Sequence, residues 1–304
     1  MTHLAIDTPL APPPARNAVL YAPDGAFSRG LPDVPAHVFA RERELAFAPG
    51  APSGLVPMDL SAALRLGWPA STPAMLARYV IVRAGENVQH TLQATGEVYY
   101  VIRGQGETQG QDAGVTWTAG DVFVLPGAGL TCHRAASDSV LLCVTDEPLV
   151  ALLGLRPPEP RHNKVVKSAY FSKASIDAEL ALVHDRTGPQ KSAGKAVNFF
   201  TSATRSVVSL LPSMSAGMNT LEPGGVQRAH HHNAAALTLG IQVEGIHSMI
   251  GDTQYDWVPF GVMVTPPLAS HSHHNHGGSM MRSFVLQDGG LFYNLRVPGF
   301  SWDE

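Results

Sequence analysis

The feature that most constrains this chain is a block of short β-rich runs that occurs twice. The runs that begin near Arg78 end in Gly or Pro, as in GEVYYVIRG and DVFVLPG, and the same texture returns from Val207 in LTLGIQVEG and VMVTPP. Such runs are typical of all-β barrels and sandwiches. The two blocks share a register with an offset of 141, which relates Gly104, Gly120 and Pro126 to Gly245, Gly261 and Pro267. This duplication predicts two barrels in one chain.

The repeat divides the chain into four parts. We expect an N-terminal arm with a short helix over 1–77, a first barrel over 78–150, a linker with one helix over 151–205, and a second barrel over 206–304. The arm contains LAPPPARN and either wraps a partner subunit or covers its own barrel; its short helix is predicted in MDLSAALRLGW, near Asp59 or Ser61. In the linker helix, Ile176, Leu180 and Val183 share one face.

Composition excludes several classes of protein. Charged residues make up 15% of the chain, the net charge is −4, and no Lys/Arg run suggests a nucleic-acid surface. No apolar stretch approaches the length of a membrane span, and the first residues lack the pattern of a secretory signal. Cys132 and Cys143 form no C-x-x-C pair. We therefore expect a cytoplasmic protein with reduced thiols, bound neither to nucleic acid nor to a membrane.

Half of the histidines lie in two short segments. Seven of the 14 occur in QRAHHHNAAAL, from Gln227, and TPPLASHSHHNHGG, from Thr265. Residues i and i+2 of a strand point to the same side, so His230 and His232 are expected inside a barrel and His231 on the opposite face. A histidine from a later strand can complete a three-nitrogen face around a metal ion.

Each block resembles the two-motif signature of the cupin superfamily, G-x5-H-x-H-x3–4-E-x6-G followed by G-x5-P-x-G-x2-H-x3-N. The second block supplies His230, His232 and Gly245 for the first motif and Gly261, Pro267, His271 and Asn275 for the second. The first block supplies Gly85, His90, Glu97 and Gly104, then Gly120, Pro126 and His133. The resemblance implies two double-stranded β-helix (jelly-roll) barrels, a bicupin.

The second block lacks the glutamate of the motif, because Thr238 stands where the acid is expected. This variant is similar to the gentisate and salicylate 1,2-dioxygenases, whose three histidines hold Fe(II). PPLASHSHHN keeps their Pro-Pro-x-x-x-His-x-His-x-Asn pattern, although Leu268 and Ser270 replace the usual tryptophans. The resemblance implies an Fe(II)-dependent dioxygenase that cleaves the ring of a hydroxylated benzoate with O2. Mn, Zn and Ni remain possible, because imidazole ligands suit several metals.

The resemblance also assigns candidate site residues. His230, His232 and His271 are the predicted metal ligands, although the offset of 141 relates His133 to His274 and leaves His271, His273 and His274 open as third ligand. His273 is a candidate for a substrate contact, and Gln242 is placed inside by strand parity. Arg228, and also Arg282, could bind an anionic substrate. His247 could line the pocket or face solvent, and His274 and His276 are expected in solvent.

The first block is a degraded copy, since Leu92 occupies the second histidine position. His90, Glu97 and His133 either hold a second metal or are relics inside a packed barrel. The rival functions are a metal-dependent cupin lyase, isomerase or decarboxylase, and a small-molecule-binding cupin without catalysis. A homodimer or homotetramer is expected from the arm.

Overall fold

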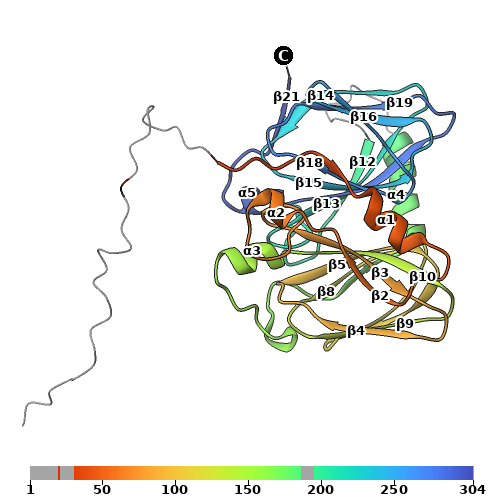
Figure 1. Ribbon diagram of the computed structural model, residues 1–304, viewed down its shortest axis with the longest axis vertical. Coiled ribbons are helices and arrows are strands. Elements are labelled where there is room, and N and C mark those ends of the chain that lie inside the picture. Colours follow the sequence, from red (N-terminus) through yellow and green to blue (C-terminus); the bar gives the residue numbers. More distant parts are fainter. Residues whose placement is uncertain (1–19, 21–30, 186–194, 304) are drawn as a thin grey trace, which may run out of the picture. The chain divides into compact units, whose positions relative to one another are not determined.

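The computed structural model describes Leu20, residues 31–185 and residues 195–303, and the LAPPPARN segment lies outside these described residues. The chain from Val34 onward forms one compact unit (Figure 1). Within the described ranges, every helix is too short or too polar to cross a bilayer.

The N-terminal barrel consists of two facing antiparallel sheets. The six-stranded sheet has the order β11-β8-β5-β10-β3-β2 and the four-stranded sheet the order β4-β9-β6-β7. Their strands are β2 (Gly54–Pro57), β3 (Leu76–Val82), β4 (Asn87–Thr91), β5 (Gly96–Arg103), β6 (Gln105–Gln109), β7 (Gly114–Thr118), β8 (Val122–Pro126), β9 (Leu130–Ala135), β10 (Ser139–Thr145) and β11 (Ala169–Phe171).

The C-terminal barrel repeats this construction. Its six-stranded sheet has the order β1-β18-β15-β20-β13-β12 and its five-stranded sheet the order β17-β16-β19-β14-β21. Their strands are β1 (His37–Val38), β12 (Lys195–Phe199), β13 (Ser215–Leu221), β14 (Val226–His232), β15 (Ala236–Gln242), β16 (Ile246–Ile250), β17 (Thr253–Asp256), β18 (Val262–Thr265), β19 (His271–Asn275), β20 (Met281–Gln287) and β21 (Phe300–Trp302).

Strand order confirms the duplication. The series β8-β5-β10-β3 recurs as β18-β15-β20-β13, and β4-β9-β6-β7 recurs as β14-β19-β16-β17. Gly104 and Gly245 both lie between a long strand and the next, with φ of 90° and 71°. That left-handed backbone favours glycine, which explains why these turn positions reveal the repeat in the sequence. The predicted all-β fold of two barrels is confirmed.

Short segments from one half of the chain complete the barrel of the other. β1 lies before the first barrel but pairs with β18 of the second, and β11 lies after the first barrel and pairs with its β8. The described residues contain six short helical segments, namely α1 (Ala40–Phe47), α2 (Ser61–Leu64), α3 (Glu147–Leu152), η2 (Pro160–His162), α4 (Lys173–Asp185) and α5 (Gly289–Asn294). The two predicted helices correspond to α2 and α4, and α4 buries Ile176 and Leu180.

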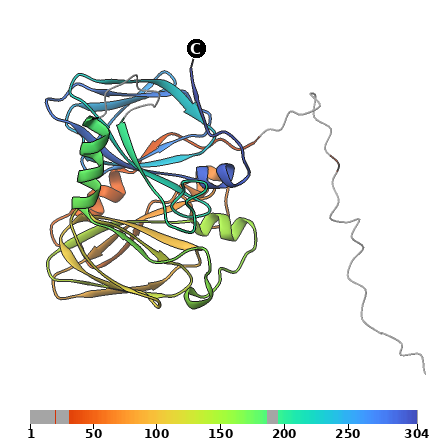
Figure 2. The same cartoon turned by 180° about the vertical axis from the view of Figure 1, so that it is seen from behind.

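The largest apolar core lies between the two six-stranded sheets, which face each other in the middle of the unit (Figures 1 and 2). The rings of Tyr100 and Phe284, one from each barrel, stack with their centroids 5.5 Å apart. Leu237 and Leu239 also belong to this core. Because alternate residues of a strand point to opposite sides, Thr238 between them faces the interior of the C-terminal barrel.

Candidate metal centre

The second barrel brings three histidines together from two neighbouring strands. β14 ends with His230 and His232, β19 begins with His271, and the register places His230 opposite His271. The ring centroid of His271 lies 4.2 Å from that of His230 and 4.7 Å from that of His232. All three side chains are buried, and His231 between the first two is half-buried on the other face.

Hydrogen bonds fix which nitrogen of each ring carries the proton. The Nδ1 atom of His230 lies 2.9 Å from the carbonyl oxygen of Arg228. The Nδ1 atom of His232 lies 2.6 Å from the carbonyl oxygen of Ala234, and that of His271 lies 2.8 Å from the carbonyl oxygen of Ala269. A carbonyl oxygen only accepts, so each Nδ1 carries the proton and donates it. Each Nε2 therefore keeps a lone pair, which is the tautomer that a metal-ligating histidine needs.

Burial keeps these imidazoles uncharged at neutral pH. It lowers the pKa of His232 to about 4. Burial, and then the neighbouring His230 and His232, lower the pKa of His271 to about 3. The pKa of His230 is lowered by the same cause. Neutral imidazoles are the ligand form for divalent transition metals, so the set fits such an ion.

His273 is held inside the same barrel by a short chain of hydrogen bonds. Its Nδ1 lies 2.7 Å from the hydroxyl of Ser248, and the indole of Trp257 donates to the same oxygen at 2.7 Å. The His273 ring centroid is 5.7 Å from that of His271, and burial holds its pKa well below the usual value. His273 thus borders the cluster, and its orientation is set by groups outside it.

Two of the other predicted residues lie elsewhere. Gln242 is exposed, because a register shift in the β15–β20 pairing between Gly240 and Gln242 ends the strand alternation used to place it inside. That prediction for Gln242 is wrong. Arg282 donates to Asp177 of α4 at 2.5 Å, so its guanidinium is engaged in an ion pair away from the histidines.

Arg228 and the C-terminal strand lie beside the cluster. Arg228 is exposed, and its guanidinium sits 5.5 Å from the Trp302 ring centroid. Trp302 lies opposite His230 in the β14–β21 pairing, with ring centroids 6.0 Å apart, and the Phe300 ring is 5.1 Å from His230. No motif in the sequence predicts this contact of Phe300 and Trp302 with His230, because the pairing joins segments about 70 residues apart.

A second group of histidines in this barrel was not expected to assemble. Within the described residues, His247, His274 and His276 each offer a nitrogen that lies within 4.8 Å of the other two. His247 faces His274 across the β16–β19 pair. The predicted solvent location holds for His276, which is exposed, whereas His274 is half-buried. The signal that could have revealed the group is the cross-strand register, which the sequence alone does not provide.

The first barrel holds a different polar cluster. Nε2 of His90 and Nε2 of His133 are 3.2 Å apart, and the hydroxyls of Tyr99 and Thr131 donate to Glu97 Oε2 at 2.5 and 3.2 Å. Burial raises the pKa of Glu97 to about 7 and lowers those of His90 and His133 to about 4 and 3. Glu97 Oε2 is thus engaged by two hydroxyl donors, whereas Oε1 is buried without a hydrogen-bond partner among the described residues.

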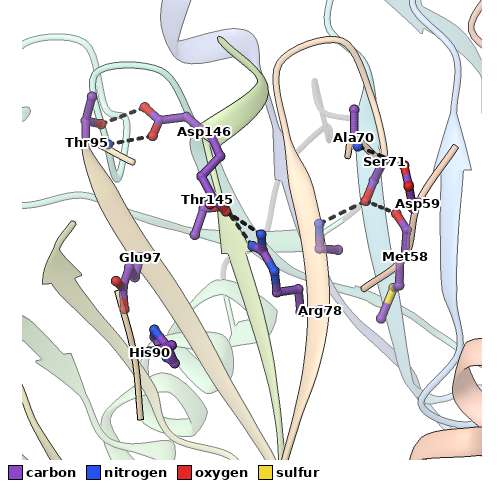
Figure 3. A network of polar contacts seen from close by, with 12 residues as sticks. Met58, Asp59, Ala70, Ser71, Arg78, His90, Thr95, Glu97, Thr145 and Asp146 are labelled. Carbon is purple, nitrogen blue, oxygen red and sulfur yellow. Dashed lines mark hydrogen bonds and ion pairs between the residues drawn. The ribbon is translucent and has the colours of Figure 1, made fainter. Parts of the chain in front are cut away.

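Among the residues that the structure describes, no basic side chain forms an ion pair with Glu97, although Arg78 is nearby (Figure 3). Its guanidinium donates to Thr145 at 3.2 Å and forms an ion pair with Glu147 at 2.5 Å. In the same region Asp146 accepts two hydrogen bonds from Thr95 and one from Ser213 of the second half of the chain. Arg78 is thus paired with Glu147 and Asp146 with neutral donors, so burial dominates the pKa of Glu97.

The structure also settles the register between the two clusters. An offset of 140 relates Thr108, Trp117 and His133 to Ser248, Trp257 and His273, and in the first barrel Trp117 likewise donates to the Thr108 hydroxyl that bonds His133. His133 therefore corresponds to His273, and neither to His274, which the offset of 141 gives, nor to His271, which the motif selects. By the same offset Leu92 and Thr131 stand where the second barrel has His232 and His271.

Strand order defines two barrels of the cupin type in one chain, which is the bicupin fold. In comparisons with known proteins, the chain superimposes on salicylate 1,2-dioxygenase from Pseudaminobacter salicylatoxidans with a TM-score of 0.72, 16% identity and 91% of each chain covered. A structure of that enzyme as an adduct with gentisate gives 0.71, 13% identity, and covers 91% of this chain and 87% of that one. These likenesses show the fold.

Sequence similarity is confined to a shorter stretch. The chain is 33% identical to 5-aminosalicylate 1,2-dioxygenase of Comamonas sp. over 84 residues, which is 27% of this chain and spans only 22% of that protein. Oxalate decarboxylase of Lactobacillus farciminis, solved as a formate complex, shares the fold with a TM-score of 0.50, 14% identity and coverage of 72% and 78%. No family model matches the sequence.

Proposed function

We propose that this bicupin is an Fe(II)-dependent dioxygenase that cleaves the ring of a hydroxylated benzoate such as salicylate or gentisate. The observation that carries the proposal is the set of three buried, neutral imidazoles of His230, His232 and His271, each with its Nδ1 proton donated to a backbone carbonyl. A facial set of this kind leaves open positions at Fe(II) for an aromatic acid and O2. The salicylate and 5-aminosalicylate dioxygenases among the similar proteins support that substrate class.

The charge of the cluster favours an anionic substrate. Three uncharged imidazoles add no negative charge, so a divalent ion held by them keeps its full charge and attracts a carboxylate with a neighbouring phenolate. Arg228 adds a positive group beside Trp302 at the edge of the cluster. We propose that Arg228 guides the carboxylate in and that His273, kept neutral by burial, contacts the bound ring.

The test is oxygen uptake by protein loaded with Fe(II) under nitrogen and offered salicylate, gentisate and 5-aminosalicylate. We expect uptake with at least one acid, its loss in the His232→Leu variant, and its retention in His231→Gln, whose side chain lies on the other face of the same strand. Iron-loaded protein that consumes no O2 with any of them contradicts the proposal. Turnover without O2 uptake would instead indicate decarboxylase or lyase chemistry, and ligand binding without turnover a binding cupin. The free thiols of Cys132 and Cys143 support a cytoplasmic location as part of the same proposal.

A further inference from the structure

A second histidine cluster lies on the outer face of the five-stranded sheet of the C-terminal barrel. Along β19 the side chains of His271, His273 and Asn275 are buried, whereas His274 is half-buried and the following His276 is exposed. Alternate strand residues point to opposite sides. His274 therefore points away from the interior cluster, and the two groups of histidines share no side chain.

Strand register brings the outer histidines together. His247 on β16 is the direct cross-strand neighbour of His274, and His276 follows His274 by two residues on the same face. Directly opposed residues have Cβ atoms about 4.5–5.5 Å apart, a distance that lets two side chains bind one group. The backbone N–H of His276 donates to the carbonyl of Gly245 at 2.9 Å, which holds this residue beside the start of β16.

The three rings are close enough to share one ion. One nitrogen of each ring lies within 4.8 Å of the others, and the His247 ring is stacked on those of His274 and His276 at centroid distances of 4.6 and 5.1 Å. Two nitrogens bound to one tetrahedral zinc ion are about 3.4 Å apart, from a bond length of about 2.0–2.1 Å. Binding of one ion therefore requires the half-buried and exposed rings to rotate out of this stack, so that their nitrogens approach and their lone pairs converge.

Neighbouring polar groups support a cation at this place. The Ser272 hydroxyl lies 2.9 Å from Nε2 of His274 and fixes the orientation of that ring, as partners of metal-ligating histidines do. Asp256 is the cross-strand neighbour of His247 on β17, so a carboxylate stands next in the row. Asp256 thus supplies a negative charge near the cluster from the outer side of the barrel.

We propose that His247, His274 and His276 form a second metal site, at the surface, for one divalent ion of the kind that prefers imidazole, such as Zn2+, Ni2+ or Cu2+. Three nitrogen ligands leave a further position for water. Mg2+ and Ca2+ are excluded by their preference for oxygen ligands. The site stands whether or not the interior cluster binds iron, because its side chains lie on the opposite face of the sheet.

The test measures zinc binding to metal-free protein by competition with a chromophoric chelator. Compared with the unmodified chain, His247→Gln and His276→Ala are each expected to bind one equivalent fewer, or to bind that equivalent at least about tenfold more weakly. The control is His162→Ala, an exposed histidine of η2, which should bind as much as the unmodified chain. Circular dichroism shows that each variant is folded.

A second measurement separates this site from the interior one. Cobalt(II) added to the His232→Leu variant should still give the visible absorption of a low-coordinate nitrogen site, and His232→Leu combined with His276→Ala should lose it. Zinc binding by His247→Gln and His276→Ala that equals the unmodified chain in amount and affinity would overturn the second site. Failure of the dioxygenase proposal would instead show as absent O2 uptake with the cobalt signal retained.

Discussion

The two barrels share one strand order and differ in what fills them. The interior of the first is packed around an apolar cluster that includes Leu92, Tyr99 and Trp117. The corresponding cluster of the second barrel, among described residues, consists of Val243, Ile246 and Met281, with four buried histidines beside it. The same framework thus holds a mainly apolar interior with a small polar cluster in one copy and a group of four buried histidines in the other.

Two positions account for most of this difference. Leu92 and Thr131 of the first barrel correspond to His232 and His271 of the second. Burying a leucine side chain stabilises a fold by about 1.5–3 kcal/mol, whereas a buried imidazole must remain neutral and hydrogen-bonded to be tolerated. We infer that the duplicated chain keeps the stabilising interior in one barrel, so that the other can carry groups that favour binding.

The largest effect is expected when the second barrel is made to resemble the first. His232→Leu copies the residue at Leu92 and removes one of the three imidazoles. Activity and iron content should fall by more than about 100-fold, beyond the loss expected for an outer partner of a ligand. The measurement is steady-state O2 uptake together with metal analysis.

The control for this exchange is His90→Leu in the first barrel. His90→Leu removes the contacts of His90 Nε2 with His133 and Tyr99 but leaves the three proposed ligands intact, so activity should stay within about twofold of the unmodified chain. If His90→Leu abolishes activity while His232→Leu does not, catalysis belongs to the first barrel and the comparison is reversed.

The next effect concerns the pH dependence of stability in the first barrel. Burial raises the pKa of Glu97 from 4.5 to about 7, so the folded chain keeps a proton that the unfolded chain loses above its own pKa. The contribution of Glu97 to the free energy of unfolding is fully present below the pKa of the unfolded chain. It is lost as pH rises through the folded pKa of about 7, a change of about 3 kcal/mol.

Glu97→Gln cannot titrate and should lack this decrease. The measurement is the free energy of unfolding by denaturant at pH 5 and pH 8, compared between the unmodified chain and the variant at each pH. Equal pH dependence for the two proteins would mean that Glu97 is ionised when folded, as it would be with a cation bound beside it.

Strand alternation and turn residues predict most of the fold because both are local. They place His230 and His232 on one face and His231 on the other, and the positive-φ glycines at Gly104 and Gly245 mark the repeat. The same reasoning failed at Gln242, where one additional residue in β15 opposes β20. A bulge is invisible to a pattern of period two.

The remaining errors come from contacts between distant strands. The offset changes from 141 at the turns to 140 in the sheets that carry the histidines, so His133 aligns with His273 and not with His274. The cover by Trp302 and the pairing of His247 with His274 depend on register. No single-sequence pattern contains that information.

A smaller effect should distinguish the matched hydrogen-bond chains of the two barrels. Ser248→Ala removes the hydroxyl shared by His273 and Trp257, and Thr108→Val removes its counterpart beside His133 and Trp117. Each change leaves buried polar atoms unpaired and should cost about 1–3 kcal/mol of stability. Only Ser248→Ala should also lower kcat/KM, by about tenfold. Equal losses of activity in the two variants would mean that both barrels contribute to the reaction.

The smallest effect is expected at the histidine that lies between two proposed ligands. The ring of His231 is on the other face of β14, where its Nδ1 lies 2.7 Å from Asp303 Oδ1 at a half-exposed position. An ion pair so exposed to water contributes about 0–1 kcal/mol. His231→Gln should therefore change kcat/KM by less than about twofold, although it is adjacent in sequence to His232. A loss as large as that of His232→Leu would show that β14 does not keep the alternation on which the whole difference between the barrels rests.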